Sequence, residues 1–274
     1  MDKTSRLQNA GPLRLGGTSC TVDAGLADNV RLLGPHADDI ELIFYEYEGQ
    51  NNFLDKRSLQ TLLKLKDEYA LTYTVHLPSR LGAGPLDEDW QKGYLRLWES
   101  CILNTYPLNP FAYIWHWDAE QYGPCPAADL QRWRSRLLNS ADALLSKDLT
   151  DPAKLCVENL GFDFSLIFPS VLERGLSVCL DIGHWWNNWP ASDQRWRNYA
   201  ERAKVFHLHG VNLSEHKDHI GLQRENLPLL KSFAEHLRKL SADGQERVLT
   251  FEVFSPQDLR DSMAIWRQIN EMTE

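Results

Sequence analysis

The feature that most constrains the fold is an alternation that repeats eight times along the 274 residues: a short apolar segment, then a longer stretch with helical spacing. The apolar segments are rich in valine, isoleucine, leucine and aromatic residues, which is typical of parallel strands covered on both faces. Stretches such as 55–70 and 130–147 place apolar residues three and four positions apart, as amphipathic helices do. Eight such units predict an α/β fold, a single-domain (β/α)8 TIM barrel, which typically takes about 250 residues. The predicted strands are 13–19, 39–45, 71–77, 111–117, 154–160, 176–183, 204–211 and 247–254.

A doubly wound open sheet is the alternative arrangement of the same units. It favours a glycine-rich phosphate turn after the first strand, and the stretch GGTSC at 16–20 is not the GxGxxG pattern of such turns. No shift in composition divides the chain. We therefore expect one catalytic TIM-barrel domain over residues 13–274, preceded by a flexible tail at residues 1–12.

Charge and cysteine usage narrow the class of protein. The chain carries 38 acidic against 29 basic residues, a formal net charge of −9, which disfavours duplex DNA as a partner. Its five cysteines form no CxxC pair, the first residues lack the apolar core of a secretory signal, and no apolar run is long enough to span a bilayer. We expect a cytoplasmic protein that binds neither nucleic acid nor membrane. The sequence leaves its oligomeric state open.

Ionisable residues recur at one end of the predicted strands. In a TIM barrel the active site lies at the C-terminal ends of the strands, and six consecutive strands here deliver His, Asp or Glu at that end. Burying ionisable groups costs free energy unless they are paired or bind a metal, and no matching set of Lys or Arg accompanies them. The strand ends therefore predict a site for divalent cations. These residues are His76, His116, Glu158, Asp181 with His184 three positions on, His207 with His209, and Glu252; Glu41 lies nearer the start of the second strand.

The ligand types narrow the choice of metal. Mixed carboxylates and imidazoles without a thiolate suit Mn²⁺, Zn²⁺, Fe²⁺ or Co²⁺, and we favour Mn²⁺ or Zn²⁺, in one to three ions. The cysteines are interpreted as core or loop residues; they are Cys20, Cys101, Cys125, Cys156 and Cys179.

The order of these strand ends resembles the xylose-isomerase-like barrel superfamily, which contains sugar-phosphate isomerases and epimerases and the endonuclease IV type of abasic-site nuclease. Within it, the chain resembles the CbiR-type cobamide-remodelling phosphodiesterases from about residue 14 to residue 258. The more specific motifs are LDIGH at 180–184 and HLHGV at 207–211, followed by DH at 218–219. The other matching motifs are LGGTSC, DDIELIFYE, TYTVHLP, CVENL, DHIGL and LTFEVFS.

The resemblance implies an activity. Those enzymes hydrolyse the nucleotide-loop phosphodiester of adenosylcobamides such as coenzyme B12 and pseudo-B12. The products are adenosylcobinamide phosphate and an α-ribazole-type nucleoside, which allows the corrinoid to be salvaged and remodelled. We therefore expect an adenosylcobamide as substrate, and attack on phosphorus by a water that a divalent ion has activated.

The resemblance also implies roles for individual residues. The central metal ligands would be Glu158, Asp181, His209 and Glu252. A second position would take His76 and His116 with Glu158 bridging, and a third would take His184 with Asp218 and His219. Nuclease members separate the last pair by one residue, whereas Asp218 and His219 are adjacent here. As a mechanistic hypothesis, the catalytic residues would be Glu158, Glu252 and His184, and His184 or His219 would either protonate the leaving oxygen or hold another ion.

Aromatic and basic residues near the strand ends suggest substrate contacts. Trp185 and Trp186 follow the sixth strand, where indole rings could stack on the flat groups of a cobamide. His207 and Arg80, the latter on the loop after the third strand, are further candidates for substrate binding. Trp115 and Trp117 flank His116 on a strand and so are predicted to face away from it and pack in the core.

Three rival functions remain at this point. A sugar-phosphate isomerase or epimerase would use Glu158 and Glu252 as acid and base on one sugar carbon. An abasic-site nuclease would need a basic surface for DNA, against which the net charge argues. A non-catalytic corrinoid- or metal-binding protein would need no open coordination position.

Overall fold

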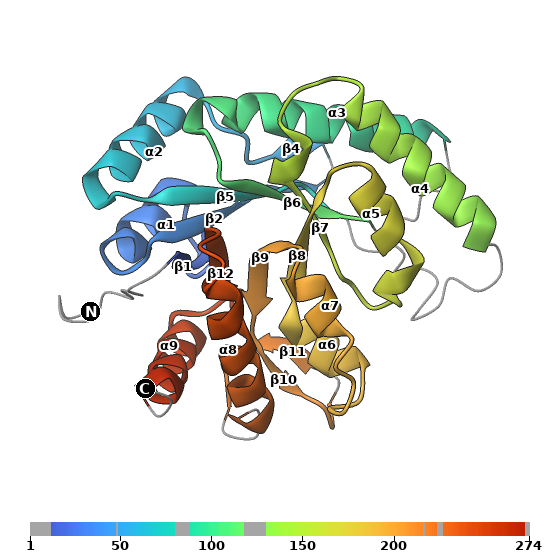
Figure 1. Cartoon of the computed structure of the whole chain (residues 1–274). Coiled ribbons are helices and arrows are strands. Elements are labelled where there is room, and N and C mark those ends of the chain that lie inside the picture. The colour runs from blue at the N-terminus through green and yellow to red at the C-terminus, as the bar shows by residue number, and fades with distance from the viewer. Residues whose placement is uncertain are drawn as a thin grey trace.

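The protein, described here from a computed structural model, is a closed barrel of eight parallel strands surrounded by helices (Figure 1). The structure describes residues 12–47, 49–79, 88–117, 130–215, 217–223 and 227–271. The barrel order is β1, β12, β9, β8, β7, β6, β5, β2, and all eight predicted strands are confirmed. The bounds are β1 Leu13–Thr18, β2 Asp39–Ile43, β5 Thr72–His76, β6 Ala112–His116, β7 Leu155–Glu158, β8 Ser177–Asp181, β9 Ala203–Leu208 and β12 Arg247–Phe251.

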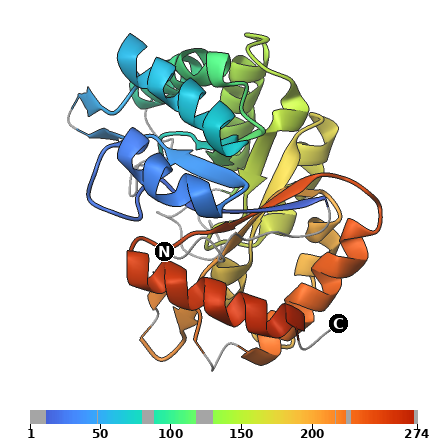
Figure 2. The ribbon, with the colours of Figure 1, turned by 90° about the vertical axis from the view of Figure 1, so that its left-hand side faces the viewer.

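Helices connect the strands and cover the outside of the barrel. The C-terminal helices, orange and red in Figure 2, lie side by side outside the strands. Side-chain caps mark some starts: the Asp55 carboxylate accepts a hydrogen bond from the Ser58 N–H at 2.7 Å before α2. The helices are α1 Leu26–Leu33, α2 Lys56–Tyr69, α3 Glu88–Thr105, α4 Leu130–Leu145, α5 Phe168–Glu173, α6 Ile182–Asn188, α7 Trp196–Ala200, α8 Leu227–Ser241 and α9 Pro256–Glu271.

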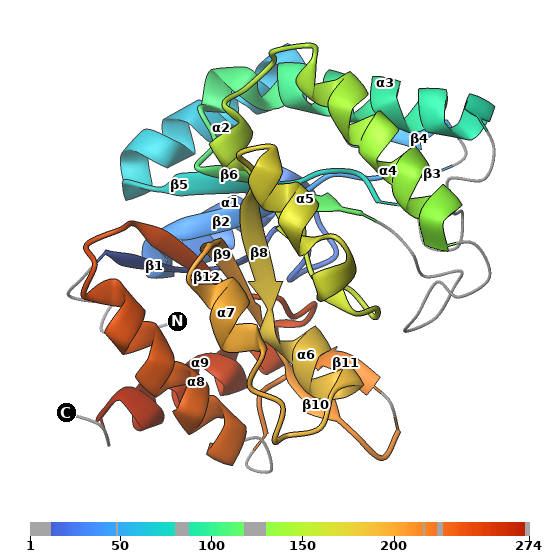
Figure 3. The ribbon, with the colours of Figure 1, turned by 45° about the vertical axis from the view of Figure 1, so that its right-hand side comes forward.

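Two small hairpins extend the C-terminal ends of barrel strands (Figure 3). The first joins β3 (Glu46–Tyr47) to β4 (Gln50–Asn51) and follows β2; the second joins β10 (Gly210–Asn212) to β11 (Lys217–Ile220) and follows β9. Because each hairpin directly follows a barrel strand, both lie at the end where a TIM barrel carries its site.

Strand alternation separates the barrel interior from the layer between strands and helices. Trp115 and Trp117 are buried and pack edge to face on each other in the large core outside the strands, as predicted, while His116 between them faces inward. A smaller apolar cluster fills one side of the interior and consists of Ala112, Ile114, Cys156, Cys179, Val205 and Val248.

The described residues bear only in part on three further expectations, which concern the N-terminal tail, Arg80 and the membrane. Residues 1–11 of the predicted tail lie outside the described residues, and Pro12 accepts a hydrogen bond from the Arg247 N–H at 3.0 Å. Arg80 also lies outside the described residues. No described helix combines the length and apolar character needed to cross a membrane.

Candidate metal centre

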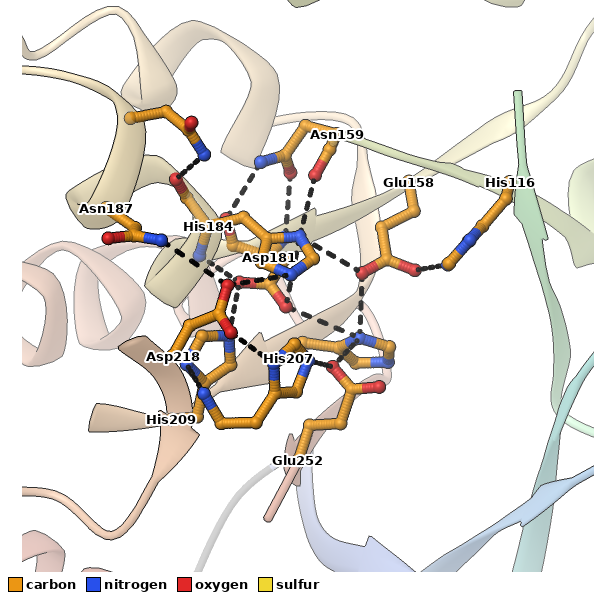
Figure 4. Close-up of polar contacts among 12 residues, drawn as sticks. His116, Glu158, Asn159, Asp181, His184, Asn187, His207, His209, Asp218 and Glu252 are labelled. Carbon is orange, nitrogen blue, oxygen red and sulfur yellow. Dashed lines mark hydrogen bonds and ion pairs between the residues drawn. The ribbon is translucent and has the colours of Figure 1, made fainter. Parts of the chain in front are cut away.

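The C-terminal ends of β7, β8, β9 and β12 bring one imidazole into contact with three carboxylates (Figure 4). His207 Nδ1 lies 3.0 Å from Glu252 Oε2, 3.2 Å from Glu158 Oε1 and 3.8 Å from Asp181 Oδ2. All four side chains are buried. One ligand atom from each lies within 4.8 Å of the others, so the four could hold a single ion.

This arrangement differs from the resemblance in one member. The resemblance places His209 with Glu158, Asp181 and Glu252, and His207 is a separate candidate for substrate binding. The structure instead places His207 among the three carboxylates and fully buries it, which leaves its ring no surface for a substrate. His207 and His209 point to the same side of the chain because they are two residues apart, so spacing alone could not choose between them.

His76 and His116 adjoin this centre through Glu158. His116 Nε2 lies 2.8 Å from Glu158 Oε2, and the Nε2 atoms of the two imidazoles are 3.1 Å apart. The three residues form a second group that could hold an ion, at the position that the resemblance implies for them. Glu158 therefore belongs to both groups.

A third group lies on the side of Asp181 that faces α6 and β11. Asp181, His184, His209 and His219 can offer atoms to one ion, so His209 joins the position predicted for His184 and His219. The rings of His209 and His219 stack with centroids 4.2 Å apart. Asp218, also predicted for this position, contacts it from the edge: its Oδ1 lies 3.1 Å from His219 Nδ1 and its Oδ2 lies 3.9 Å from His184 Nε2.

Backbone carbonyls lie next to one ring nitrogen in each of three histidines. The Nδ1 atoms of His76, His184 and His209 lie 3.0, 3.4 and 3.1 Å from the carbonyl oxygens of Leu77, Asn159 and Gly210. His209 Nδ1 also accepts from the His219 N–H at 3.0 Å, and His184 Nδ1 lies 3.8 Å from Asp181 Oδ2. At His76, an Nδ1–H that donates to the carbonyl leaves the Nε2 lone pair directed at the centre, which is the usual arrangement of metal-binding histidines. His207 is reversed: its Nε2 lies 2.8 Å from Glu41 Oε2, and Nδ1 faces the carboxylates.

Neighbouring charges, rather than burial, set the ionisation of the centre. Burial alone would raise the pKa of Glu158, but His207 and His116 outweigh it and hold that pKa well below its usual range. Burial likewise opposes the charged form of His207, yet the surrounding acidic groups hold its pKa well above the usual value. The shifts of Glu158 and His207 therefore favour the charged form of each, because the two groups stabilise one another.

Buried polar atoms in this network have no hydrogen-bond partner in the described part of the chain. They include Asp181 Oδ2, Glu252 Oε2 and His209 Nε2; the imidazole nitrogens near these carboxylate oxygens lie within ion-pair distance but lack hydrogen-bond geometry. Buried polar groups that lack partners are unusual in native proteins. Carboxylate oxygens and imidazole nitrogens are good donors for Zn²⁺ and Mn²⁺, so the residues present fit a divalent metal.

The sequence did not single out the residue that positions Asp181. The Asn159 side chain accepts from the Asp181 N–H at 2.7 Å and donates to the Asp181 carbonyl at 2.8 Å (Figure 4). Asn159 is buried and directly follows Glu158, so it ties the end of β7 to the end of β8. Gly183 makes room for the His209 ring, because a Cβ atom at position 183 would lie 2.3–2.5 Å from three atoms of that ring.

Cys179 is another unexpected neighbour of the centre. Its sulfur and one ligand atom each of Glu158 and His207 lie within 4.8 Å of one another, although the sequence indicated only a core cysteine. The side chain is buried, and burial raises the pKa of the thiol well above its usual value. Cys179 is therefore a core residue, as expected, but one that lies directly beneath the centre.

The prediction that Trp185 and Trp186 contact a substrate conflicts with their burial. They lie on α6, are 2% and 5% exposed, and belong to the large hydrophobic core. Trp185 packs beside Trp189 and Tyr199. Asp181, the N-cap of α6, and His184, in its first turn, point toward the centre, whereas the rings of Trp185 and Trp186 point away from it. An exposed aromatic ring next to the centre is instead Phe254, which stacks on His219 with centroids 5.4 Å apart and is 47% exposed.

Comparison with known proteins supports the fold. A family model described as "Xylose isomerase-like TIM barrel" matches residues 28–269. The solved structure of endonuclease IV from Thermus thermophilus matches with a TM-score of 0.69 and 18% identity, covering 94% of this chain and 99% of that one. The structure of a D-tagatose 3-epimerase-like protein matches with a TM-score of 0.66 and 18% identity, covering 94% of this chain and 97% of that one. The structure of the IolI protein with a bound zinc atom matches with a TM-score of 0.65 and 14% identity, covering 94% of this chain and 96% of that one. No curated protein matches the sequence.

Proposed function

Because the chain belongs to the xylose isomerase-like TIM barrel family, we propose that it is a metal-dependent phosphodiesterase that hydrolyses the nucleotide-loop phosphodiester of adenosylcobamides. The products would be adenosylcobinamide phosphate and an α-ribazole-type nucleoside. The proposal places the enzyme in cobamide remodelling and salvage, in the cytoplasm, without a nucleic-acid or membrane partner.

The observation that carries the proposal is the sharing of ligands between adjoining groups. Glu158 belongs to the central group and to the group of His76 and His116, and Asp181 belongs to the central group and to that of His184, His209 and His219. Acid–base work on one sugar carbon needs two flanking carboxylates, whereas a phosphodiester carries a negative charge that repels nucleophiles. Divalent ions in such groups would neutralise the phosphoryl oxygens and make water more acidic.

The residues of the chain would bind and orient the substrate around this centre. His184 is partly exposed, and although burial opposes its charged form, Asp181 and Glu158 raise its pKa. If ions occupy only the first two groups, His184 is not a ligand, and in its protonated form it would donate to the nucleoside oxygen as it leaves. Asn159 would keep Asp181 in place, and the exposed face of Phe254 would stack on a flat part of the substrate.

The choice of a cobamide depends on the sequence resemblance, with LDIGH at 180–184 and HLHGV at 207–211 as its specific parts. The net charge of −9 further disfavours an abasic duplex, which would need a basic surface.

A sugar-phosphate isomerase or epimerase is the second candidate. The observation in its favour is the approach of two carboxylates to His207: Glu158 Oε1 at 3.2 Å and Glu252 Oε2 at 3.0 Å. Such a pair could act as acid and base on opposite sides of a sugar carbon.

Incubation with three substrates would separate these functions. Purified protein loaded with Mn²⁺ or with Zn²⁺ would be given adenosylcobalamin, ketose phosphates or an abasic duplex, and the products separated by chromatography. We expect adenosylcobinamide phosphate and the nucleoside from the first substrate alone. Turnover of a ketose phosphate with intact adenosylcobalamin would establish the second candidate instead.

A further inference from the structure

The barrel interior beneath the centre has an apolar side and a polar side. The strands from β6 to β9 supply most of the cluster that contains Ile114, Cys156, Cys179 and Val205. On β2, β5 and β12, by contrast, a polar residue lies two positions before a residue at the mouth of the barrel, where the metal centre lies. Because side chains two residues apart on a strand point to the same face, these polar side chains also point into the barrel. The pairs are Asp39 before Glu41, Thr74 before His76, and Thr250 before Glu252.

Four atoms on this polar side lack a hydrogen-bond partner among the residues that the structure describes. They are Asp39 Oδ1, Glu41 Oε1, Thr74 Oγ1 and Thr250 Oγ1. All four residues are fully buried, and Thr74 lies near enough to Asp39 to lower the pKa of that carboxyl, although burial outweighs it. A buried polar atom without a partner costs about 1–3 kcal/mol, and native proteins satisfy such atoms with protein groups or with ordered water.

Strand register places these four groups around one region. Glu41 is paired with Thr74, and Gly16 is paired with Asp39 on one side and with Thr250 on the other. A Cβ atom at Gly17 would meet side chains of α1 and α9, so Gly17 faces the helices and Gly16 faces the barrel interior. Gly16 therefore adds no side chain between Asp39 and Thr250.

We propose that the polar side of the barrel interior binds ordered water molecules that bridge Glu41, Thr74, Thr250 and Asp39. Water is the fitting ligand because two hydroxyls and two carboxylates offer both donors and acceptors, and a buried water typically makes about three hydrogen bonds. The site adjoins the metal centre, because Glu41 also lies in a group with His76 and Glu252 that could hold an ion, but it does not depend on which reaction the centre catalyses.

The water site connects to the centre through Glu41. One oxygen of Glu41, Oε2, lies 2.8 Å from His207 Nε2, and the other, Oε1, would be held by water. Glu41 is then fixed from both sides, and it directs Nδ1 of His207 toward the carboxylates. Glu41 is thus a positioning residue that acts through His207.

Substitutions at two positions of the polar side test the proposal through the sign of their effect. Thr250→Val removes a hydroxyl that water would satisfy, so we expect the folding equilibrium constant to fall about tenfold, or ~1.4 kcal/mol, in denaturant titrations without added metal. Thr74→Val should act in the same direction. A dry interior predicts the opposite, because valine would then remove an unsatisfied hydroxyl, and an unchanged or increased constant for both variants overturns the proposal.

Val248→Thr is the matched control. Val248 lies on the same strand, two residues from Thr250, and belongs to the apolar cluster. A hydroxyl added there meets no water, so this variant should lose at least as much stability as Thr250→Val although it changes the side chain in the opposite sense.

A high-resolution crystal structure gives an independent readout should the variants fail to fold. The proposal expects density for water within hydrogen-bond distance of at least two of the four atoms. Absence of density there, or an anomalous signal that identifies a metal ion at the same place, overturns it. Neither result bears on whether adenosylcobalamin is hydrolysed, so this proposal and the proposed function can fail separately.

Discussion

Two buried carboxyl groups in the same barrel have pKa values that are shifted in opposite directions. Glu158 at the mouth has a pKa well below its usual range, whereas burial raises the pKa of Asp39, near the floor, to about 6. Both side chains are fully buried, so burial does not explain the difference. The neighbours do: Glu158 contacts His207 and His116, while Asp39 accepts a hydrogen bond from the Thr72 hydroxyl at 2.6 Å.

The comparison shows why the mouth suits a metal and the floor suits water. At the mouth, carboxylates stay charged and some of their oxygens have no hydrogen-bond partner among the described residues. At the floor, a carboxyl without a cationic partner keeps its proton more readily and needs only hydroxyls or water. Substitutions at the two ends of the barrel should therefore have different consequences.

The largest effect is expected at Glu158. Glu158→Gln keeps the shape but removes the charge shared by two of the groups, so we expect hydrolysis of adenosylcobalamin to fall about 10³-fold, or ~4 kcal/mol. Metal content by elemental analysis should fall with it. Asp39→Asn is the matched control at the floor: it touches the centre only through water and Glu41, so it should lower activity far less than Glu158→Gln does. A Glu158→Gln enzyme with full activity would remove Glu158 from the proposed site.

A smaller loss is expected in the stability of the metal-free protein when the imidazole among the carboxylates is removed. His207→Ala leaves Glu158, Asp181 and Glu252 without their shared cation, which should cost about 3–5 kcal/mol of unfolding free energy in urea titrations at pH 8. Divalent metal should restore part of that loss. A variant within about 1 kcal/mol of wild type would show that the three carboxylates do not need this histidine.

The pKa of Asp39 predicts a pH dependence at the floor. Between pH 4 and 6 the unfolded chain has already released this proton while the folded chain keeps it, so this group makes stability fall as pH rises, by about 3 kcal/mol over the window. Asp39→Asn removes the dependence. Relative to wild type, the variant should therefore gain stability as pH increases from 4 to 7, as measured by urea unfolding across that range. A constant difference would contradict the raised pKa.

The smallest effect concerns the exposed ring at the mouth. If Phe254 stacks on a flat part of the substrate, Phe254→Leu should raise KM for adenosylcobalamin about fivefold, or ~1 kcal/mol, with little change in kcat. Trp185→Phe changes a buried aromatic ring on the other side of α6 and should leave KM unaltered. Equal KM values for wild type and Phe254→Leu would exclude this contact.

The fold could be predicted from the sequence because each strand carries its own signal. Eight apolar segments between helical stretches gave the number of strands, and the rule that parallel strands present their C-terminal ends together placed His76, His116, Glu158, Asp181 and Glu252 in one region. These are properties of local sequence and of barrel connectivity.

Details that depend on which way a side chain turns could not be predicted in the same way. His207 and His209 share one face, and only packing decides that His207 meets Glu158 and Glu252 while His209 meets Asp181. Trp185 and Trp186 follow His184 directly, but α6 begins at Ile182, and its rotation turns both rings into the core. Asn159 gave no signal, because its contacts are with the backbone of a strand that follows 22 residues later in the chain.

Anomalous diffraction from crystals soaked in Mn²⁺ or Zn²⁺ tests the central claim most directly. We predict a strong peak within coordination distance of Glu158, Asp181, His207 and Glu252, with any further peaks beside His116 or His209. A structure in which the metal binds elsewhere while these four side chains contact only one another would contradict the account.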